Sequence, residues 1–354
     1  VVSLVWFIAG YSLAFGANGN AGLQPFIGSL DMLFLNGVSL QTANALLPGI
    51  PEFLFISFQM TFAIITPALV TGAFAERMKY SALLLFTALW SLLVYAPICH
   101  WVWGGGFLGS AGVLDFAGGA VVHVNSGVAG LVCAIVLGRR KGYGVEPILA
   151  HNPVLTMIGA SLLLVGWIGF NAGSAGAAND LMGVALLNTL LAAAAAALTW
   201  KIVEYIEKKK VSLIGMLSGV VAGLVAITPA AGFVDPKGAV IIGLIAGPVC
   251  YASSVWIKKL LRYDDSLDAF GIHGAGGLIG ALLTGVFAST AINSLSEGAN
   301  IGAQALGLLW TIVYSAIGTL IILFVCKFTT GLRVSEAEET AGLDTSLHGE
   351  ALEP

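Results

Sequence analysis

The chain has 354 residues, of which 58% are hydrophobic and 10% are charged, and its mean hydropathy is +0.94. Soluble domains usually carry about 25% charged residues, so this composition excludes a soluble globular protein. The apolar content also excludes a disordered chain, and the 46 glycines lack the three-residue period of collagen. The composition therefore predicts an all-α polytopic membrane protein whose helices pack closely through small residues.

The formal net charge of −4 is concentrated at the C-terminus. Residues 335–354 contain no Lys or Arg and six acids, which are Glu336, Glu338, Glu339, Asp344, Glu350 and Glu353. Without them the chain has 15 basic and 13 acidic residues, a net charge of +2. We therefore divide the chain into a transmembrane domain over 1–326 and a polar C-terminal tail over 327–354.

Ten apolar segments approach the length of about 20 residues that a helix needs to cross the hydrocarbon core. In chain order they are 1–15, 51–75, 80–103, 117–138, 152–175, 181–206, 212–230, 237–258, 268–291 and 301–326. The first is too short for a full span, and it begins without a Met or the charged region of a signal peptide. We interpret it as a span cut short by the limits of the chain, and one missing helix before it would give eleven spans.

The basic residues predict the orientation of these spans. Fourteen of the fifteen lie in alternate loops or after the last span, and the exception is Lys237. Because Lys and Arg flank cytoplasmic loops, the first segment should run outward and the C-terminus should be cytoplasmic. The full-length N-terminus is then expected outside, in a multi-pass protein of the cytoplasmic (inner) membrane.

Two histidines interrupt otherwise apolar spans. His123 is followed by glycines at offsets of four and seven residues, and His273, which lies 150 residues later, is followed by glycines at the same offsets. Five spans separate the two helices, so they should cross the membrane in opposite directions. This pattern predicts inverted five-helix repeats, an architecture in which transporters place their site near the membrane midplane. We expect the two imidazoles to meet there.

Other interpretations of the paired histidines are open at this point. A buried His can be a hydrogen-bonded packing residue, and two axial His ligands could hold a haem. The repeated glycines favour close helix packing around a functional pair. Two neutral imidazoles can donate and accept hydrogen bonds to a small polar solute, whereas a metal cation would want oxygen ligands and an anion would want Arg or Lys. The sequence thus predicts a protein that is not an enzyme and that has no cofactor or metal.

Acidic residues precede both histidine helices. Asp115 is placed to cap the first of them, where the helix macrodipole favours a negative charge. We expect Asp268 to hold the corresponding position before the second helix. Together with Asp264 and Asp265, it is interpreted mostly as a solvated loop or cap acid.

Three further polar side chains lie in or at the ends of spans. Gln59 and Asn171 are expected to hydrogen-bond the backbone or neighbouring helices, a common use of such residues in membranes. His100, at the outer end of its span, is expected to be a packing or hydrogen-bonding residue.

Six segments carry a resemblance to a known family. They are FQMTFA (58–63), HWVWGGG (100–106), DFAGGAVVHVNSGVAGL (115–131), GWIGFNAGSAG (166–176), FGIHGAGG (270–277) and GLRVSEAEETAGLDTSLHGE (331–350). In this order they resemble the ammonium transporters of the Amt/Mep/Rh family, specifically its prokaryotic Amt branch. The resemblance covers nearly the whole chain and implies the eleven-helix fold of that branch, with the first helix and part of the second absent here.

The resemblance implies roles for aromatic residues. Phe62, Trp103 and Ser174 match the positions that recruit ammonium, a task suited to cation–π attraction and a hydroxyl acceptor. Phe170 matches the second ring of a phenyl gate formed with Phe62. Phe58 is a weaker candidate for the wall of the same vestibule.

By the same resemblance, His123 and His273 form a twin-histidine pore, and Asp115 gives it structural and electrostatic support. The implied function is selective transport in which ammonium, or its analogue methylammonium, is recruited outside and loses its proton, after which the amine passes the histidines. The alternative is an ammonium sensor with the same fold and little flux, a type that usually continues into a signalling domain. A third possibility is an Rh-type channel for ammonia or carbon dioxide.

The resemblance also implies partners. These are a lipid bilayer, two further copies of the chain in a homotrimer, and a PII-type signal protein at the cytoplasmic face, with no nucleic acid. The acidic tail taken alone is typical of a solvated, disordered segment. Its match to the family instead implies an ordered regulatory tail packed along the cytoplasmic face.

Overall fold

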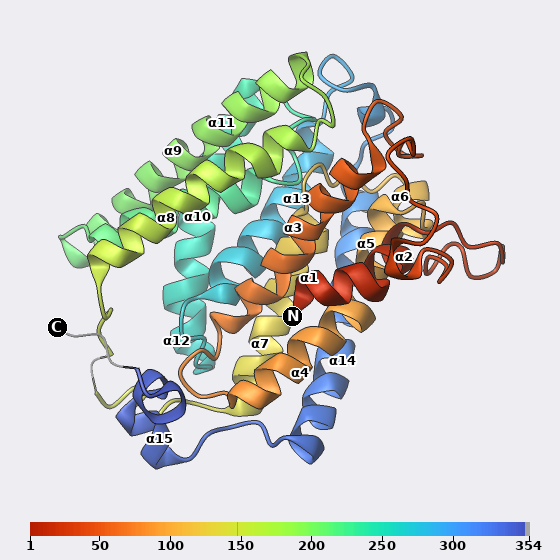
Figure 1. Cartoon of the computed structure of the whole chain (residues 1–354). Coiled ribbons are helices and arrows are strands. Elements are labelled where there is room, and N and C mark those ends of the chain that lie inside the picture. Colours follow the sequence, from red (N-terminus) through yellow and green to blue (C-terminus); the bar gives the residue numbers. More distant parts are fainter. Residues whose placement is uncertain (147, 351–354) are drawn as a thin grey trace.

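The computed structural model describes residues 1–146 and 148–350, and within them the chain is helical, with two isolated β-bridges and no strand (Figure 1). Its α-helices are α1 (Val2–Val5), α2 (Tyr11–Phe15), α3 (Glu52–Thr71), α4 (Tyr80–Trp90), α5 (Ala96–Trp103), α6 (Phe107–Ser110), α7 (Asn125–Leu137), α8 (Pro153–Trp167), α9 (Asp180–Lys208), α10 (Leu213–Ile227), α11 (Pro236–Tyr251), α12 (Lys258–Leu261), α13 (Ala275–Phe287), α14 (Ile301–Thr329) and α15 (Glu336–Ala341).

Turns of π-helix join many of these helices into longer spans. They are η1 (Trp6–Gly10), η3 (Ser91–Tyr95), η4 (Gly119–Val124), η5 (Ile168–Ala172), η6 (Ala252–Ile257) and η7 (Phe270–Gly274). In the described part of the chain, eight of the resulting helices are long and apolar enough to cross a membrane, and two shorter apolar helices cover Val2–Phe15 and Leu213–Ile227. The ten predicted segments are therefore confirmed as helices.

Polar residues fix where several spans begin. At the N-terminus of a helix the first backbone N–H groups lack partners, and a short polar side chain can accept from them. Five spans begin in this way, with caps provided by Asn152, Asn179, Ser212, Asp235 and Asn300. Proline follows two of these caps, where its fixed φ suits the first helical turn.

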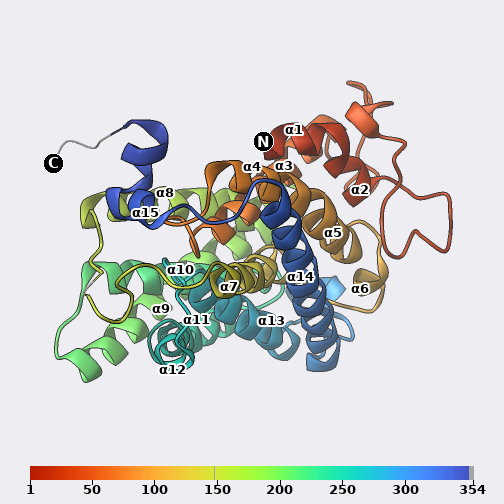
Figure 2. The ribbon, with the colours of Figure 1, turned by 90° about the horizontal axis from the view of Figure 1, so that it is seen from below.

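Successive spans alternate in direction, so the loops fall at two ends of the molecule. One end holds the loops 72–79, 138–146, 148–152, 209–212 and 262–269 and the described part of the tail, and we call it the basic end. We call the opposite end the distal end. Helices α8 to α11 form one group, and α3, α4, α7 and α14 form another (Figures 1 and 2). Helix α13 contacts both groups.

The two histidine helices run antiparallel in this arrangement. Helix α7 ends at the basic end, while the helix formed by η7 and α13 begins there, and Arg140 after α7 forms an ion pair of 2.8 Å with Asp264 before η7. The two histidine helices therefore cross in opposite directions, as the inverted repeat predicted.

Candidate functional site

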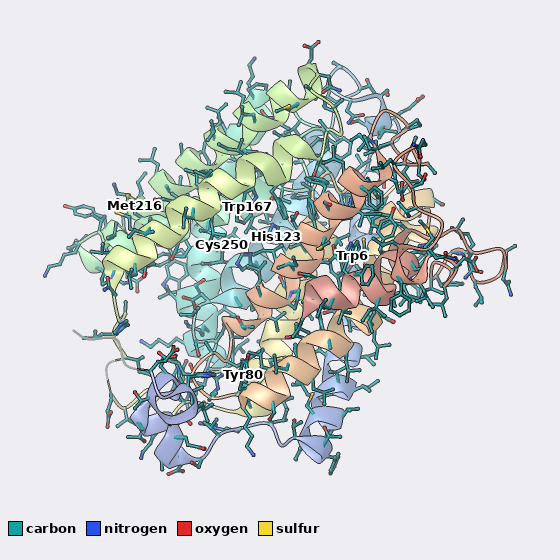
Figure 3. All side chains as sticks on the ribbon, in the orientation of Figure 1. Trp6, Tyr80, His123, Trp167, Met216 and Cys250 are labelled. Carbon is teal, nitrogen blue, oxygen red and sulfur yellow. The ribbon has the colours of Figure 1, made fainter. Side chains whose placement is uncertain are left out.

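The two histidines meet at the centre of the bundle. Nδ1 of His123 lies 3.3 Å from Nδ1 of His273, and the rings are 5.3 Å apart and nearly parallel. One ring can donate to the other across this contact, which leaves both Nε2 atoms for other partners. In the described residues, Nε2 of His123 has no hydrogen-bond partner although it is buried. Figure 3 shows His123 deep in the molecule, beside Trp167.

Both histidines lie in π-helical turns, and glycines bring these turns together. A Cβ atom on Gly127 would lie 2.3 Å from the backbone N of Gly274, and one on Gly277 would lie 3.1 Å from Cβ of His123. Each glycine stands four residues after the histidine of its own helix. The shared offset of four residues between histidine and glycine therefore corresponds to a reciprocal helix crossing. In this crossing, the glycine of each helix packs against the histidine turn of the other.

An acid caps each histidine helix, and the acid that caps the second helix is not the one predicted. The Asp115 carboxylate accepts from the four backbone N–H groups of residues 118–121 at 2.5 to 3.1 Å. On the other helix, Asp265 accepts from Ala269 N at 3.0 Å and Phe270 N at 2.8 Å. Asp115 and Asp265 each lie eight residues before their histidine, so the predicted correspondence with Asp268 was wrong.

Aromatic rings continue from the histidines toward the distal end. Phe170 lies 6.0 Å from the His123 ring and stacks on Phe62 at 4.3 Å with an angle of 28°. Phe62 in turn meets Trp103 edge to face at 5.5 Å and Phe58 at 4.9 Å. The structure therefore brings the predicted aromatic residues into one continuous series that ends at the histidine pair.

A cavity of about 630 Å³ opens beside this series at the distal end. Phe58, Phe62, Trp103 and Ser174 all line it, whereas Phe170 and the histidines lie beyond it. The Ser174 hydroxyl donates to the Phe170 carbonyl at 2.8 Å, so its oxygen lone pairs are available as acceptors. A cavity with aromatic walls and a hydroxyl acceptor suits a small cation.

Two residues of the site were not predicted from the sequence. Trp167 stacks on the His123 ring at 5.3 Å with an angle of 17°, and its indole N–H is held by Thr228. Gln59 was expected to hydrogen-bond the helices around it, but its buried Oε1 has no partner among the described residues, and the side chain lines the cavity. By contrast, Asn171 does bond a neighbouring helix, through Thr189 at 3.0 Å.

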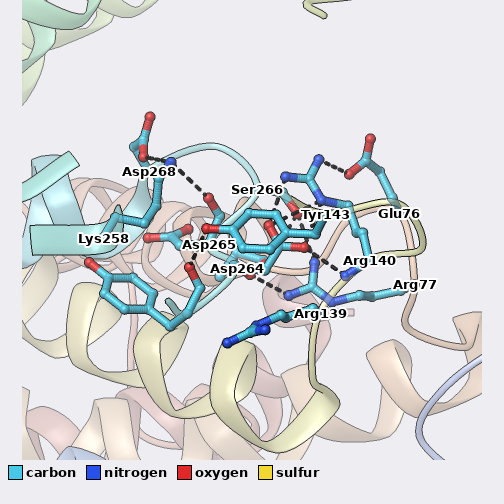
Figure 4. A network of polar contacts seen from close by, with 12 residues as sticks. Glu76, Arg77, Arg139, Arg140, Tyr143, Lys258, Asp264, Asp265, Ser266 and Asp268 are labelled. Atoms are coloured by element: carbon cyan, nitrogen blue, oxygen red, sulfur yellow. Dashed lines mark hydrogen bonds and ion pairs between the residues drawn. The ribbon is translucent and has the colours of Figure 1, made fainter. Parts of the chain in front are cut away.

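The acids at the basic end belong to a buried ionic network (Figure 4). Arg140 binds both carboxylate oxygens of Asp264 and also contacts Glu76. Arg77 donates to the Asp264 carbonyl at 2.5 Å and to Ser266 Oγ at 2.8 Å. The network ties the loops after α3, after α7 and before η7 to one another.

Their burial contradicts the interpretation of these acids as solvated. Asp264 and Asp265 are each 1% exposed. Burial alone would raise the pKa of Asp264, but hydrogen bonds and the charge of Arg140 outweigh it and lower that pKa. Burial and the neighbouring Asp268 raise the pKa of Asp265 to about 6. Asp268 is partly exposed and pairs with Lys258.

Asp265 should make stability depend on pH in a defined window. Its folded-state pKa of about 6 exceeds the ordinary value of 3.8, so the folded protein holds a proton that the unfolded chain has released. Between these two values, each unit by which the pH rises therefore lowers the free energy of unfolding of the wild type by about 1.4 kcal/mol. We expect Asp265→Asn to remove this loss, so that its melting temperature in detergent gains on the wild type between pH 4 and pH 6.

The exposed Asp31 provides the control for this experiment, since Asp31→Asn should leave the pH profile unchanged. Asp264 does not contribute in this pH window. Its folded-state pKa is lowered, so the stability that its ionised form provides is fully present above the ordinary pKa of 3.8 and is lost only as the pH falls below that value. If the melting temperatures of the wild type and of Asp265→Asn changed with pH in the same way across this range, burial of Asp265 would not raise its pKa.

The described part of the tail is packed against the basic end. Leu332 O accepts from Lys79 N at 2.8 Å, and Arg333 donates to the Leu137 carbonyl at the end of α7. Helix α15 follows, with a capping box formed by Ser335 and Glu338. Helix α14 extends to Thr329, three residues into the predicted tail. Of the six predicted tail acids, Glu353 lies outside the described residues.

Comparisons with known proteins agree with this architecture. The family model described as Ammonium Transporter Family matches residues 1–352. A curated ammonium transporter of Bacillus subtilis is 48% identical over 358 residues, covering 99% of this chain and 86% of that protein. The ammonium transporter Amt1 of Archaeoglobus fulgidus is 45% identical, covering 99% of this chain and 87% of that protein.

Solved structures show the same fold. The crystal structure of Saccharomyces cerevisiae Mep2 superposes with a TM-score of 0.86 at 36% identity, over 94% of this chain and 77% of that one. A structure titled Sensor Amt Protein superposes with a TM-score of 0.88 at 34% identity, over 98% of this chain and 87% of that one. On these grounds the chain is a multi-pass membrane transporter rather than an enzyme, and it belongs to the ammonium transporter family.

Proposed function

We propose that the chain recruits ammonium at its distal cavity, that ammonium there gives its proton to water on the outer side of the stacked Phe62 and Phe170 rings, and that ammonia is conducted past His123 and His273. The observation that carries this proposal is the unbroken series of ring contacts from the cavity wall to the paired histidines, each between 4.3 and 6.0 Å. A small solute that follows this series passes from the aromatic cavity, past the stacked phenyl rings, to the two imidazoles.

The cavity supplies what a bare ammonium ion needs at recruitment. The indole face of Trp103 and the ring of Phe62 attract a cation, and each N–H of ammonium requires an acceptor. Ser174 Oγ provides one acceptor. Gln59 lines the same cavity, but its Oε1 atom is buried. Asp115 contributes indirectly, because its carboxylate is occupied by backbone N–H groups while its carbonyl accepts from the Trp103 indole at 2.8 Å.

The stacked phenyl rings explain why the proton must leave. Phe62 is 1% exposed, and a dry hydrophobic constriction opposes the passage of an ion with its hydration shell. Ammonia is neutral and loses far less hydration, so it can cross. Beyond the gate, the twin histidines provide polar atoms in an otherwise apolar passage, with one ring donating and the other accepting.

Replacing Trp103 by Leu tests recruitment. Loss of a partly desolvated cation–π contact, worth about 0.5–2 kcal/mol, should raise the KM for methylammonium by roughly two- to thirtyfold while leaving the maximal rate less affected. Uptake of labelled methylammonium into proteoliposomes measures both values. Trp256→Leu is the matched control, because Trp256 is half-exposed near the basic end. Unchanged uptake kinetics in Trp103→Leu would remove the cation–π argument.

A sensor remains the second candidate, because a sensor protein is among the structural neighbours. The purified chain in liposomes separates the two functions when ammonium binding and ammonium flux are measured on the same preparation. Flux that saturates with ammonium and exceeds that of empty liposomes supports transport. Binding without flux supports the sensor. Ammonium-dependent current in the same system would show whether the proton follows the ammonia.

The orientation and partners extend this proposal. The basic end would face the cytoplasm and the distal end the outside, as the fourteen basic residues indicate. Helix α8 exposes an apolar face that includes Val154, Met157 and Ile158, which suits packing against a second copy in a homotrimer. A PII-type protein would bind at the basic end beside the tail. The mass of the protein in mild detergent, corrected for bound detergent, tests the trimer.

A further inference from the structure

His100 makes a pair of contacts that the site described above does not use. It is fully buried in α5, one turn before Trp103. Its Nδ1 atom lies 2.8 Å from the carbonyl oxygen of Ala14 in α2, and its Nε2 atom lies 2.6 Å from the carbonyl oxygen of Gln24 in the loop 16–51. Both distances are those of hydrogen bonds, and both partners can only accept.

The chemistry of imidazole restricts how both contacts can form. A neutral ring carries one N–H and one bare nitrogen, and a bare nitrogen repels a carbonyl oxygen at such a distance. An imidazolium carries two N–H groups and satisfies both carbonyls. The Ala14 carbonyl also lies in the last turn of α2, where the helix macrodipole favours a positive charge. The geometry therefore selects the doubly protonated form.

No competing charge reaches the ring. The ionisable residues on elements around α5 are Tyr11, Asp31, Glu52, Tyr95, Cys99, Asp115, His123 and Tyr314. Glu52 accepts from Tyr11 and Asn44, Asp115 accepts from four backbone N–H groups, and Asp31 is exposed. In the described structure no carboxylate bonds to His100, so the two carbonyls are the polar partners of its ring.

The His100 contact belongs to a larger junction of α5 and α6 with the loop. Three consecutive loop carbonyls accept hydrogen bonds there, those of Gln24 from His100, Pro25 from Phe107 N at 3.0 Å, and Phe26 from Trp101 Nε1 at 2.7 Å.

The junction also shapes the turn that follows Trp103. The carbonyl of His100 accepts from Gly104 N and Gly106 N, each at 3.0 Å. A Cβ atom on Gly104 would lie 2.0 Å from the Ala14 carbonyl oxygen and 2.6 Å from Nδ1 of His100. The chain therefore turns directly against the His100 ring as it leaves Trp103, and the position of the indole depends on that ring.

We propose that His100 acts as an imidazolium clamp, a positioning residue that holds α2 and the loop carbonyl of Gln24 against α5 and thereby orients Trp103 for cation recruitment. The clamp itself follows from contacts within the chain. Its effect on ammonium affinity rests on the function proposed above.

The sequence permits a direct measurement of the protonation state. Cys99–His100 is the only Cys–His pair in the chain. Labelling with carbonyl-13C cysteine and 15N histidine therefore selects His100 among the five histidines, and its backbone signal can be correlated with its ring nitrogens. Because both ring nitrogens face carbonyl oxygens, we expect two protonated ring nitrogens in the folded wild type at about pH 6. A bare ring nitrogen at every pH from about 5 to about 9 would overturn the proposal.

Transport supplies the second readout. The amide nitrogen of His100→Gln can donate to one of the two carbonyls but the side chain cannot become charged. We therefore expect the KM for methylammonium to rise about fivefold, as for the loss of one hydrogen bond. The exposed His151→Gln should match the wild type. A KM for His100→Gln equal to that of the wild type would refute the positioning role. Because the spectrum is recorded on the wild type without substrate, it tests the clamp even if His100→Gln fails to fold or the chain carries no flux.

Discussion

Removing either ring of the histidine pair should abolish selective transport. In His123→Ala or His273→Ala, ammonia loses a polar partner in a passage that is otherwise apolar, and one lost hydrogen bond corresponds to roughly a tenfold effect. The space left by the ring is polar on one side and large enough for water. A column of water would admit hydrated cations, so we expect ammonium flux to fall at least about tenfold and discrimination against potassium to disappear.

The measurement compares ammonium and potassium currents in proteoliposomes for the wild type and the two single variants. His151→Ala is the matched control, because that histidine is exposed in a loop at the basic end. Trp167 stacks on His123, so removing His123 should disturb the site more than removing His273. Wild-type flux and wild-type selectivity in both variants would mean that the histidines do not form the conducting path.

Most of the architecture could be predicted from the sequence because a membrane imposes strong rules. The apolar segments predicted ten helices, and the five spans between His123 and His273 predicted that their helices run in opposite directions. The paired glycine offsets predicted close packing around the two histidines. These signals are periodic and repeat along the chain, so each one supports the others.

The acids before η7 show where such reasoning fails. Asp264, Asp265 and Asp268 lie within five residues, and charge alone suggested solvated loop residues. Which of them is buried depends on Arg77 and Arg140, which reach them from loops more than 120 residues away in sequence. The offset of eight residues before each histidine was present in the sequence and would have identified Asp265 as the partner of Asp115.

The polar atoms of the cavity were harder to predict. Whether the buried Oε1 atom of Gln59 finds a partner on a neighbouring helix depends on side-chain packing that has no sequence period. The same holds for His100, whose two partners are backbone carbonyls of residues distant in sequence. Residue type indicates that such a side chain needs partners, but only the fold shows which partners it has.

Substituting a glycine where the two histidine helices cross should also have a large effect. Gly127→Ala would place a methyl group 2.3 Å from the Gly274 backbone nitrogen and 2.4 Å from its Cα, and no side chain can move aside to make room. Overpacking of this kind costs about 1–3 kcal/mol. It should also separate the two histidine turns, so we expect both a lower melting temperature in detergent and a loss of ammonium flux.

Gly159→Ala provides the control, since it makes the same change in the middle of α8, where a Cβ atom would meet nothing within 4 Å. Alanine stabilises a helix interior by about 0.5–1 kcal/mol relative to glycine, so Gly159→Ala should melt at or above the wild-type temperature with normal flux. If Gly127→Ala destabilises the protein and Gly159→Ala does not, glycine is required at residue 127 because of the close helix crossing, and not because of its effect on helix propensity. If Gly127→Ala matched Gly159→Ala in both measurements, the helices could not cross as closely as the structure shows, and the histidine contact of 3.3 Å would lose its basis.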